Sequence, residues 1–197
     1  YVIPRPRRPY AEEVRTTTGA LRIAWTDEAF GGTPVAGDVR EALHDTVGLC
    51  RELGHELTEA APQFDFGAFM DATHTLWTAF VAHGVDGVAA LTGRTPGPDN
   101  LEATTLKCWE EGRAVSALAL LAALDANNLV CRRVAALFRD YDVLLTPTTA
   151  ELPLPLGEMN ADDPSLSARD WTEKVFTYAA FTGLFNTTGQ PAVSLPL

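Results

Sequence analysis

The sequence predicts an α/β fold in which a mixed β-sheet is covered by helices, and three observations support this class. Residues 21–25 and 55–59 read as short strands on either side of a helical pattern at 39–53, an order typical of two parallel strands joined by a helix. A further strand, apolar after its first residue, follows at 142–145. Between these strands, residues 66–139 repeat apolar side chains at helical spacing, as helices that cover a sheet do.

The composition is that of a folded, acidic chain. Its 197 residues are 46% hydrophobic, which is enough for one sizeable domain with a core. The formal net charge of −11 disfavours nucleic acid and anionic membrane as partners. The three cysteines lack metal-binding or disulfide spacing and read as buried side chains of a reducing compartment. No apolar signal segment and no apolar run of the ~20 residues that span a bilayer occurs, so we expect a cytoplasmic protein without membrane contact.

The first part of the chain divides into a connector and a strand pair. Residues 1–20 read as an extended connector, because prolines interrupt its basic segment. Apolar and polar side chains alternate over 21–25, as in a strand with one buried face. Gly54 follows the first helical pattern at a position where glycine often ends a helix, and the strand at 55–59 comes directly after it.

The middle of the chain predicts three helices. The first covers 66–85, with Gly84 and Gly87 weakening its end. The second opens after Asp99 and Glu102, which have the spacing of a capping box. The proline-free stretch up to residue 139 is then expected to hold one short and one long helix. Its weak point is Gly112, and Ser116 is expected inside a helix with its hydroxyl bonded to its own turn.

The last part of the chain predicts a strand, a helix and a second strand. The strand at 142–145 is apolar after its first residue, as expected of a strand buried on both faces of a sheet. Asp170 and Glu173 have capping-box spacing and open a helix that runs to Leu184. Residues 192–197 alternate and read as a strand.

The residues alone offer no catalytic machinery. No serine lies in a G-x-S-x-G motif, and the histidines do not cluster as metal ligands. The chain holds no H-E-x-x-H motif, no dinucleotide fingerprint and no P-loop. We therefore expect no catalytic residue, no metal and no cofactor in this chain.

Two segments together resemble the amidase signature family. Residues 141–149 are similar to its D-x-L-L-x-P-T segment, and residues 185–196 resemble its F-N-x-x-G-x-P-A-x-S-x-P segment. Residues 21–57 look like the strand–helix–strand that follows the family's signature region. The general look is close to amidases of the 6-aminohexanoate-cyclic-dimer hydrolase type. The resemblance implies part of the amidase signature fold and a bacterial-type hydrolase of linear or cyclic amide C–N bonds.

The family's catalytic residues have no counterpart here. Its members use a Lys, a cis-Ser and a nucleophilic Ser, and both serines lie in a Gly/Ser-rich signature. This chain has no such run, and Lys107 and Lys174 are its only lysines. Residues 21–197 thus resemble the C-terminal portion of an amidase signature domain, truncated at both ends, and we expect this fragment to be inactive alone.

The resemblance suggests three residues for substrate binding. The variable helices of the family cover the substrate cleft, and Trp77 falls near a cleft position; the alternative is a core aromatic. Asn186 and Gln190 are expected to contact substrate or an active-site loop; the alternative is that they only form turns. The expected partner is a neutral, partly apolar, small-molecule amide, and a homodimer would cover apolar surface left exposed.

Two other classes remain open at this point. One is a non-enzymatic α/β domain that keeps the amidase scaffold and binds a small molecule or a protein. The other is an accessory subunit that completes an active site in trans. Fold alone does not separate these classes from an enzyme, because one scaffold hosts many functions.

Overall fold

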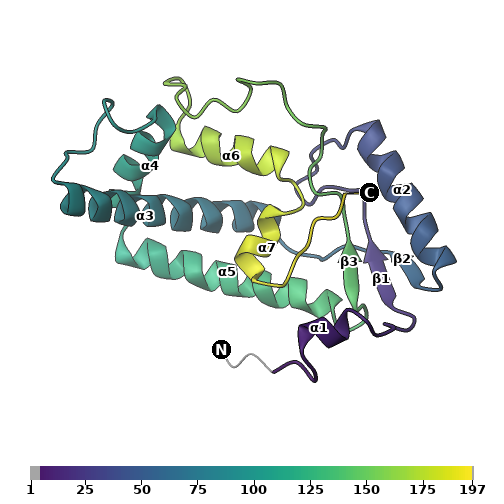
Figure 1. Ribbon diagram of the computed structural model, residues 1–197. Coiled ribbons are helices and arrows are strands. Elements are labelled where there is room, and N and C mark those ends of the chain that lie inside the picture. The colour runs from purple at the N-terminus through teal and green to yellow at the C-terminus, as the bar shows by residue number, and fades with distance from the viewer. Residues whose placement is uncertain (1–4, 197) are drawn as a thin grey trace.

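A three-stranded parallel sheet stands at one end of the molecule, and a group of packed helices forms the other end (Figure 1). The computed structural model describes residues 5–196. Strand order is β2-β1-β3, with β1 at Arg22–Trp25, β2 at Glu56–Glu59 and β3 at Val143–Leu145. Helix α2, Gly37–Glu52, connects β1 to β2, and the two strands pair in parallel. The predicted strand–helix–strand unit and the α/β class are confirmed.

The central strand alone is well buried. Ile23 pairs with Leu57 on one side and with Val143 on the other. Ile23 and Ala24 are buried, whereas Val143 is 39% exposed. The prediction that the strand at 142–145 is buried on both faces is therefore wrong. Only β1 flanks this strand in the described structure, so it is an edge strand.

The helical layer is built around one long helix. Helix α3, Phe66–Thr92, packs against α4, Ala103–Arg113, and α5, Ala117–Leu137. Helix α6, Ala168–Tyr178, lies on the opposite side of α3 from α5, and α7, Gly183–Thr188, packs against α5 (Figure 1). A one-turn helix, α1 at Tyr10–Glu13, precedes the sheet.

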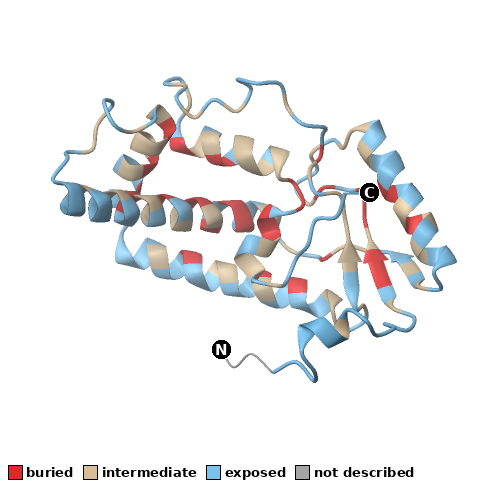
Figure 2. Cartoon of the chain, in the orientation of Figure 1, coloured by how far each residue is buried: buried red, intermediate tan, exposed pale blue. Residues whose placement is uncertain are grey.

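The main core lies between α3, α5 and α7. Its buried members are Phe69, Met70, Val130, Val134 and Leu184. Figure 2 shows buried residues gathered along α3 and on β1. Phe69 meets Phe64 and Phe176 in edge-to-face contacts with ring centroids 5.8 and 5.7 Å apart. Such aromatic pairs add to the free energy gained by burial, so they help to hold α6 against α3.

Helix α3 runs past the predicted end. It continues through Gly84 and Gly87 and stops at Gly93, whose φ of 69° is the left-handed conformation that glycine adopts without strain. The predicted end of this helix at residue 85, weakened by Gly84 and Gly87, is wrong. Each glycine lowers helix stability by about 1 kcal/mol relative to alanine. The extensive packing of α3 against α4 and α5 outweighs this cost.

The starts of α4 and α5 are capped by side chains other than the predicted ones. Asp99 and Glu102 form no capping box: α4 begins at Ala103, whose N–H donates to Asp162 Oδ1 at 3.1 Å. Ser116 does not bond back to its own turn but caps α5, where its Oγ accepts from Ala119 N at 3.1 Å. The predicted short and long helices are confirmed, with the break after Gly112.

The predicted cap of the last helix is displaced. Ser167 and Asp170 form the capping box of α6, in place of Asp170 and Glu173. The helix also ends at Tyr178 and a turn separates it from α7, so the prediction of one helix to Leu184 is wrong.

Residues 192–196 form no strand, so that prediction is wrong for the described part of the segment; Leu197 lies outside the described residues. No backbone hydrogen bond joins residues 190–196 to another segment within the described range. A strand requires such a partner, and the alternating pattern alone does not supply one. The side chain of Ser194 still meets that of Thr148, with 2.9 Å between their hydroxyl oxygens.

No single helix within residues 5–196 is both long and apolar enough to cross a bilayer. Helices α4 and α5 meet the length and composition test only when they are taken together, and they are bent by 107°.

Candidate functional site

A hollow of about 350 Å³ opens between α3, α6 and α7, and we call it the first hollow. Helix α3 forms one wall, α6 a second, and α7 with the turn before it closes one end. The lining residues are Thr73, Leu76, Trp77, Phe80, Trp171, Thr172, Val175, Phe176, Ala179, Thr182, Gly183, Asn186 and Thr187. None of them carries a charge, so the hollow suits a neutral ligand with apolar and hydrogen-bonding parts.

Two of the three predicted site residues meet in this hollow. Trp77 comes from α3 and Asn186 from α7, and both line it. The Trp77 side chain is 48% exposed, so it is not a core aromatic. Asn186 is exposed and its side chain makes no hydrogen bond within the described range, which leaves its amide oxygen and amide N–H groups available to a ligand.

Gln190 lies apart from the other two residues. It is not among the residues that line the first hollow. It follows Gly189, which ends α7 with a φ of 70°, and its Oε1 accepts a hydrogen bond from Thr188 Oγ1. Its role in substrate contact therefore stays a prediction, with no support from its position.

The sequence reasoning missed the α6 wall. Trp171, Val175 and Phe176 face the hollow from this helix. Trp171 and Val175 are four residues apart, as are Thr172 and Phe176, so these side chains share one helical face, and that pattern could have marked a mostly apolar stripe. Nothing in the pattern indicates that this stripe faces Trp77, because the two helices meet only through tertiary packing.

A buried histidine joins the walls behind the first hollow. His74 of α3 is only 8% exposed. Its Nδ1 lies 3.1 Å from Thr172 Oγ1 of α6, and its Nε2 lies 2.6 Å from Glu111 Oε1 of α4. The Thr172 hydroxyl also lies 2.9 Å from Ala168 O, and which ring nitrogen of His74 donates depends on its tautomer. The ring thus links three helices and holds α6 in place.

Two reactive side chains of α4, Lys107 and Cys108, are not free to act as nucleophiles. Lys107 Nζ donates to Pro164 O at 2.6 Å and to Leu166 O at 2.7 Å, which fixes the segment before α6. Burial raises the pKa of the Cys108 thiol to about 11, so this group stays protonated near neutral pH. Within residues 5–196, no group of three or more His, Cys, Asp and Glu side chains has the geometry to hold a metal.

The chain was compared with known proteins. The sequence model of the Amidase family matches residues 1–197. The chain is 26% identical over 203 residues to the 6-aminohexanoate-cyclic-dimer hydrolase of Paenarthrobacter ureafaciens, covering 100% of this chain and 41% of the relative. It is 27% identical over 199 residues to the lipoamidase of Enterococcus faecalis, covering 90% of this chain and 27% of the relative. The chain thus spans less than half the length of the curated relatives it matches.

Solved structures agree with these matches at the level of the fold. The structure of a 6-aminohexanoate cyclic dimer hydrolase superposes with a TM-score of 0.85 at 23% identity, over 96% of this chain and 41% of that one. A bacterial aryl acylamidase of the amidase signature family superposes with a TM-score of 0.75 at 16% identity, over 94% of this chain and 39% of that one. The predicted fold is confirmed.

Proposed function

The chain belongs to the amidase family, and on that premise we propose that it forms one wall of the substrate cleft of an amide hydrolase. The reaction is hydrolysis of an amide C–N bond in a linear or cyclic substrate. The Lys, cis-Ser and nucleophilic Ser of this family have no counterpart among the residues of this chain, so the chain alone binds substrate without cleaving it.

The uncharged first hollow carries this proposal. The aromatic faces of Trp77 and Trp171 pack well against an apolar chain. The Asn186 side chain has an acceptor oxygen and a donor NH₂ group, which complement the N–H and C=O of an amide. A charged substrate would lose its hydration there without gaining a partner of opposite charge, so a neutral amide is favoured.

Two features support the remaining parts of the proposal. The 6-aminohexanoate-cyclic-dimer hydrolase and the lipoamidase are both hydrolases by name, and the chain is similar to both. The three cysteines are free thiols, as expected of a protein that stays in the reducing cytoplasm. Light scattering on the purified chain tests the homodimer, which stays a prediction.

A non-enzymatic binding domain is the second candidate. The observation that favours it is that helices α3, α6 and α7 of this one chain form the first hollow without help from another molecule. A small neutral molecule could therefore bind without a catalytic step.

Amide hydrolysis by two proteins tests the proposal. One is the purified 197-residue chain, and the other is the product of any longer reading frame that also encodes a Lys and a Gly/Ser-rich signature. With hexanamide and a cyclic amide as substrates, the longer protein should release amine or ammonia and the chain should match the blank. Cleavage by the chain, free of longer contaminant, would contradict the wall role. Binding by the chain, together with flanking start and stop codons, would favour the binding domain.

A further inference from the structure

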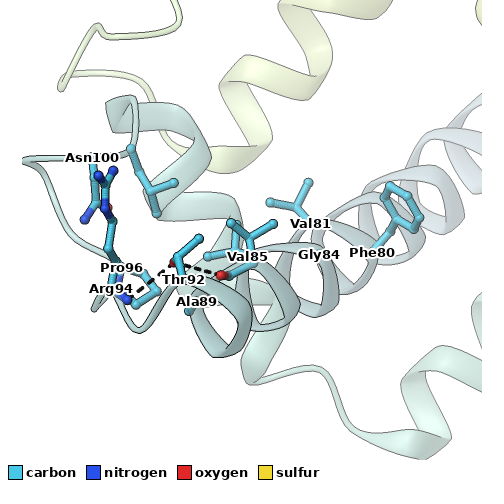
Figure 3. Close-up of a pocket in the computed structure, with 11 residues that line it drawn as sticks. Phe80, Val81, Gly84, Val85, Ala89, Thr92, Arg94, Pro96 and Asn100 are labelled. Carbon is cyan, nitrogen blue, oxygen red and sulfur yellow. Dashed lines mark hydrogen bonds between the residues drawn. The ribbon is translucent and has the colours of Figure 1, made fainter.

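A second hollow of about 370 Å³ continues along α3 beyond the first hollow. Its walls are the second half of α3 and the segment that follows this helix, including Arg94 and Leu101. Figure 3 shows Phe80 at one end of the second hollow and Arg94 with Asn100 at the other. Phe80 lines both hollows, so they lie next to each other and share this side chain.

The residues between the two hollows form a single line on α3. Trp77, Phe80, Gly84 and Val88 follow each other at spacings of three or four residues, so they share one face of the helix. Trp77 and Val88 are about 16 Å apart along the helix axis. Phe80 is 71% exposed, and a Cβ added to Gly84 would meet no atom within 4 Å. The floor between the hollows is therefore apolar and open.

The far end of the second hollow carries a positive charge. The guanidinium group of Arg94 makes no ion pair and no hydrogen bond within residues 5–196, although the formal net charge of the chain is −11; its main-chain N–H donates to Thr92 Oγ1 at 3.4 Å. The loop that carries it is held by its own bonds. Asn100 accepts from Gly97 N at 3.1 Å and donates to Thr95 O at 2.9 Å. Arg94 is thus a cation on an ordered loop that is free to pair with an anion.

We propose that the two hollows form one track for the monoamide of a long aliphatic dicarboxylic acid. The amide group lies beside Trp77 and Asn186, the methylene chain crosses Phe80 and Gly84, and the carboxylate pairs with Arg94. The position of the amide rests on the proposed function. The chain and carboxylate positions rest on the second hollow, whose apolar floor and single cation match those two parts of the ligand.

Calorimetric titration of the 197-residue chain with the monoamide of dodecanedioic acid tests the track. Gly84→Leu fills the floor without a clash, since nothing lies within 4 Å of the added Cβ, and should weaken binding at least tenfold. Gly87→Leu is the matched control: its Cβ also meets no atom within 4 Å, but Gly87 does not line the hollow, so affinity should not change. Circular dichroism checks that both variants fold. Equal binding by Gly84→Leu and wild type would overturn the track.

The charge at the far end has its own test. Arg94→Gln should weaken the monoamide several-fold and should not affect the analogue whose carboxylate is replaced by a primary alcohol. The wild-type preference for the carboxylate should also shrink as salt is raised. Equal losses for both ligands, or none, would overturn the role of Arg94. Binding of hexanamide as tightly as the alcohol analogue would overturn the chain position.

These tests measure binding, so they separate this inference from the proposed function. If the long ligands follow the predicted pattern but no amide is hydrolysed by a longer protein, the proposed function fails alone. If short amides are hydrolysed and Gly84→Leu has no effect on the long monoamide, the track fails alone.

Discussion

Gly112 of α4 lies directly against the main chain of Thr78 in α3. A Cβ added to Gly112 would be 2.0 Å from the Thr78 carbonyl oxygen and 2.8 Å from the Cβ of Ala82. Real Cβ atoms do not approach backbone so closely, so only glycine fits at this point. The two helices therefore touch through their backbones, and Thr104 and Cys108 are buried along the same helix.

This contact predicts that Gly112→Ala destabilises the protein. The added methyl group meets backbone atoms, which cannot rotate away, so we expect a loss of about 1–3 kcal/mol or more in the free energy of unfolding. Urea denaturation measures it. Gly87→Ala is the control: its site is open, and it should be neutral or stabilise by up to about 1 kcal/mol. Similar effects of the two variants would contradict the close contact.

Glu111 is predicted to stabilise the fold through its contact with His74. Glu111→Ala leaves Nε2 of a buried imidazole without its partner at 2.6 Å, and we expect a loss of about 1 kcal/mol, because Glu111 itself is half exposed. Glu111→Gln keeps a polar group at the same place and should recover most of the loss. Chemical denaturation of both variants tests this. If alanine is tolerated as well as glutamine, the His74 link contributes nothing to stability.

The Arg22–Asp142 ion pair joins β1 to the residue before β3, and it predicts that the stability of the fold depends on pH. Side-chain and main-chain hydrogen bonds from Arg22 lower the pKa of Asp142 from 3.8 to about 2. A folded-state pKa below the unfolded one means that ionised Asp142 favours the folded state above about pH 4. This contribution is lost as the pH falls from about 4 to about 2.

Denaturation of Asp142→Asn against wild type checks this window. The difference in free energy of unfolding should be present near neutral pH and should vanish toward pH 2. Asp45→Asn, on the exposed face of α2, is the control and should track wild type throughout. A difference that persists unchanged in acid would show that Asp142 acts through something other than its charge.

The first hollow predicts a ranking among three variants. Trp77→Ala removes an aromatic wall and should weaken neutral amide binding about tenfold, or raise KM by that factor in a longer active protein. Asn186→Ala removes one hydrogen bond to the ligand and should weaken amide binding several-fold. Gln190→Ala should do least, because Gln190 does not line the hollow. Calorimetry measures the affinities, with Trp109→Phe as a control outside the hollow. A larger effect at Gln190 than at Trp77 would reverse the assignment.

Sequence patterns predicted those strands and helices that depend on interactions between residues close together in the chain. The strand at 21–25 alternates and sits between turn residues, and it forms β1 as expected. The end of α3 could not be predicted, because tertiary contacts outweigh the local cost of Gly84 and Gly87. The start of α4 depends on Asp162, which lies far along the chain.

The candidate site shows the same division. Family resemblance suggested Trp77 and Asn186, and folding brings them to one hollow. Trp171 was missed because its importance comes from facing Trp77, a relation that no spacing within α6 records. The second hollow was also out of reach, since it depends on α3 continuing past Gly84 to Thr92.

Helix α3 keeps two sets of residues apart. Phe69, Met70, His74 and Thr78 are buried and hold the fold, whereas Trp77, Phe80, Gly84 and Val88 are exposed and face the hollows. Substitutions in the second set change the shape of the hollows at little cost to stability. A lineage could therefore acquire new ligand preferences by drift along this one line of α3, and a library randomised at the same positions should yield many folded variants.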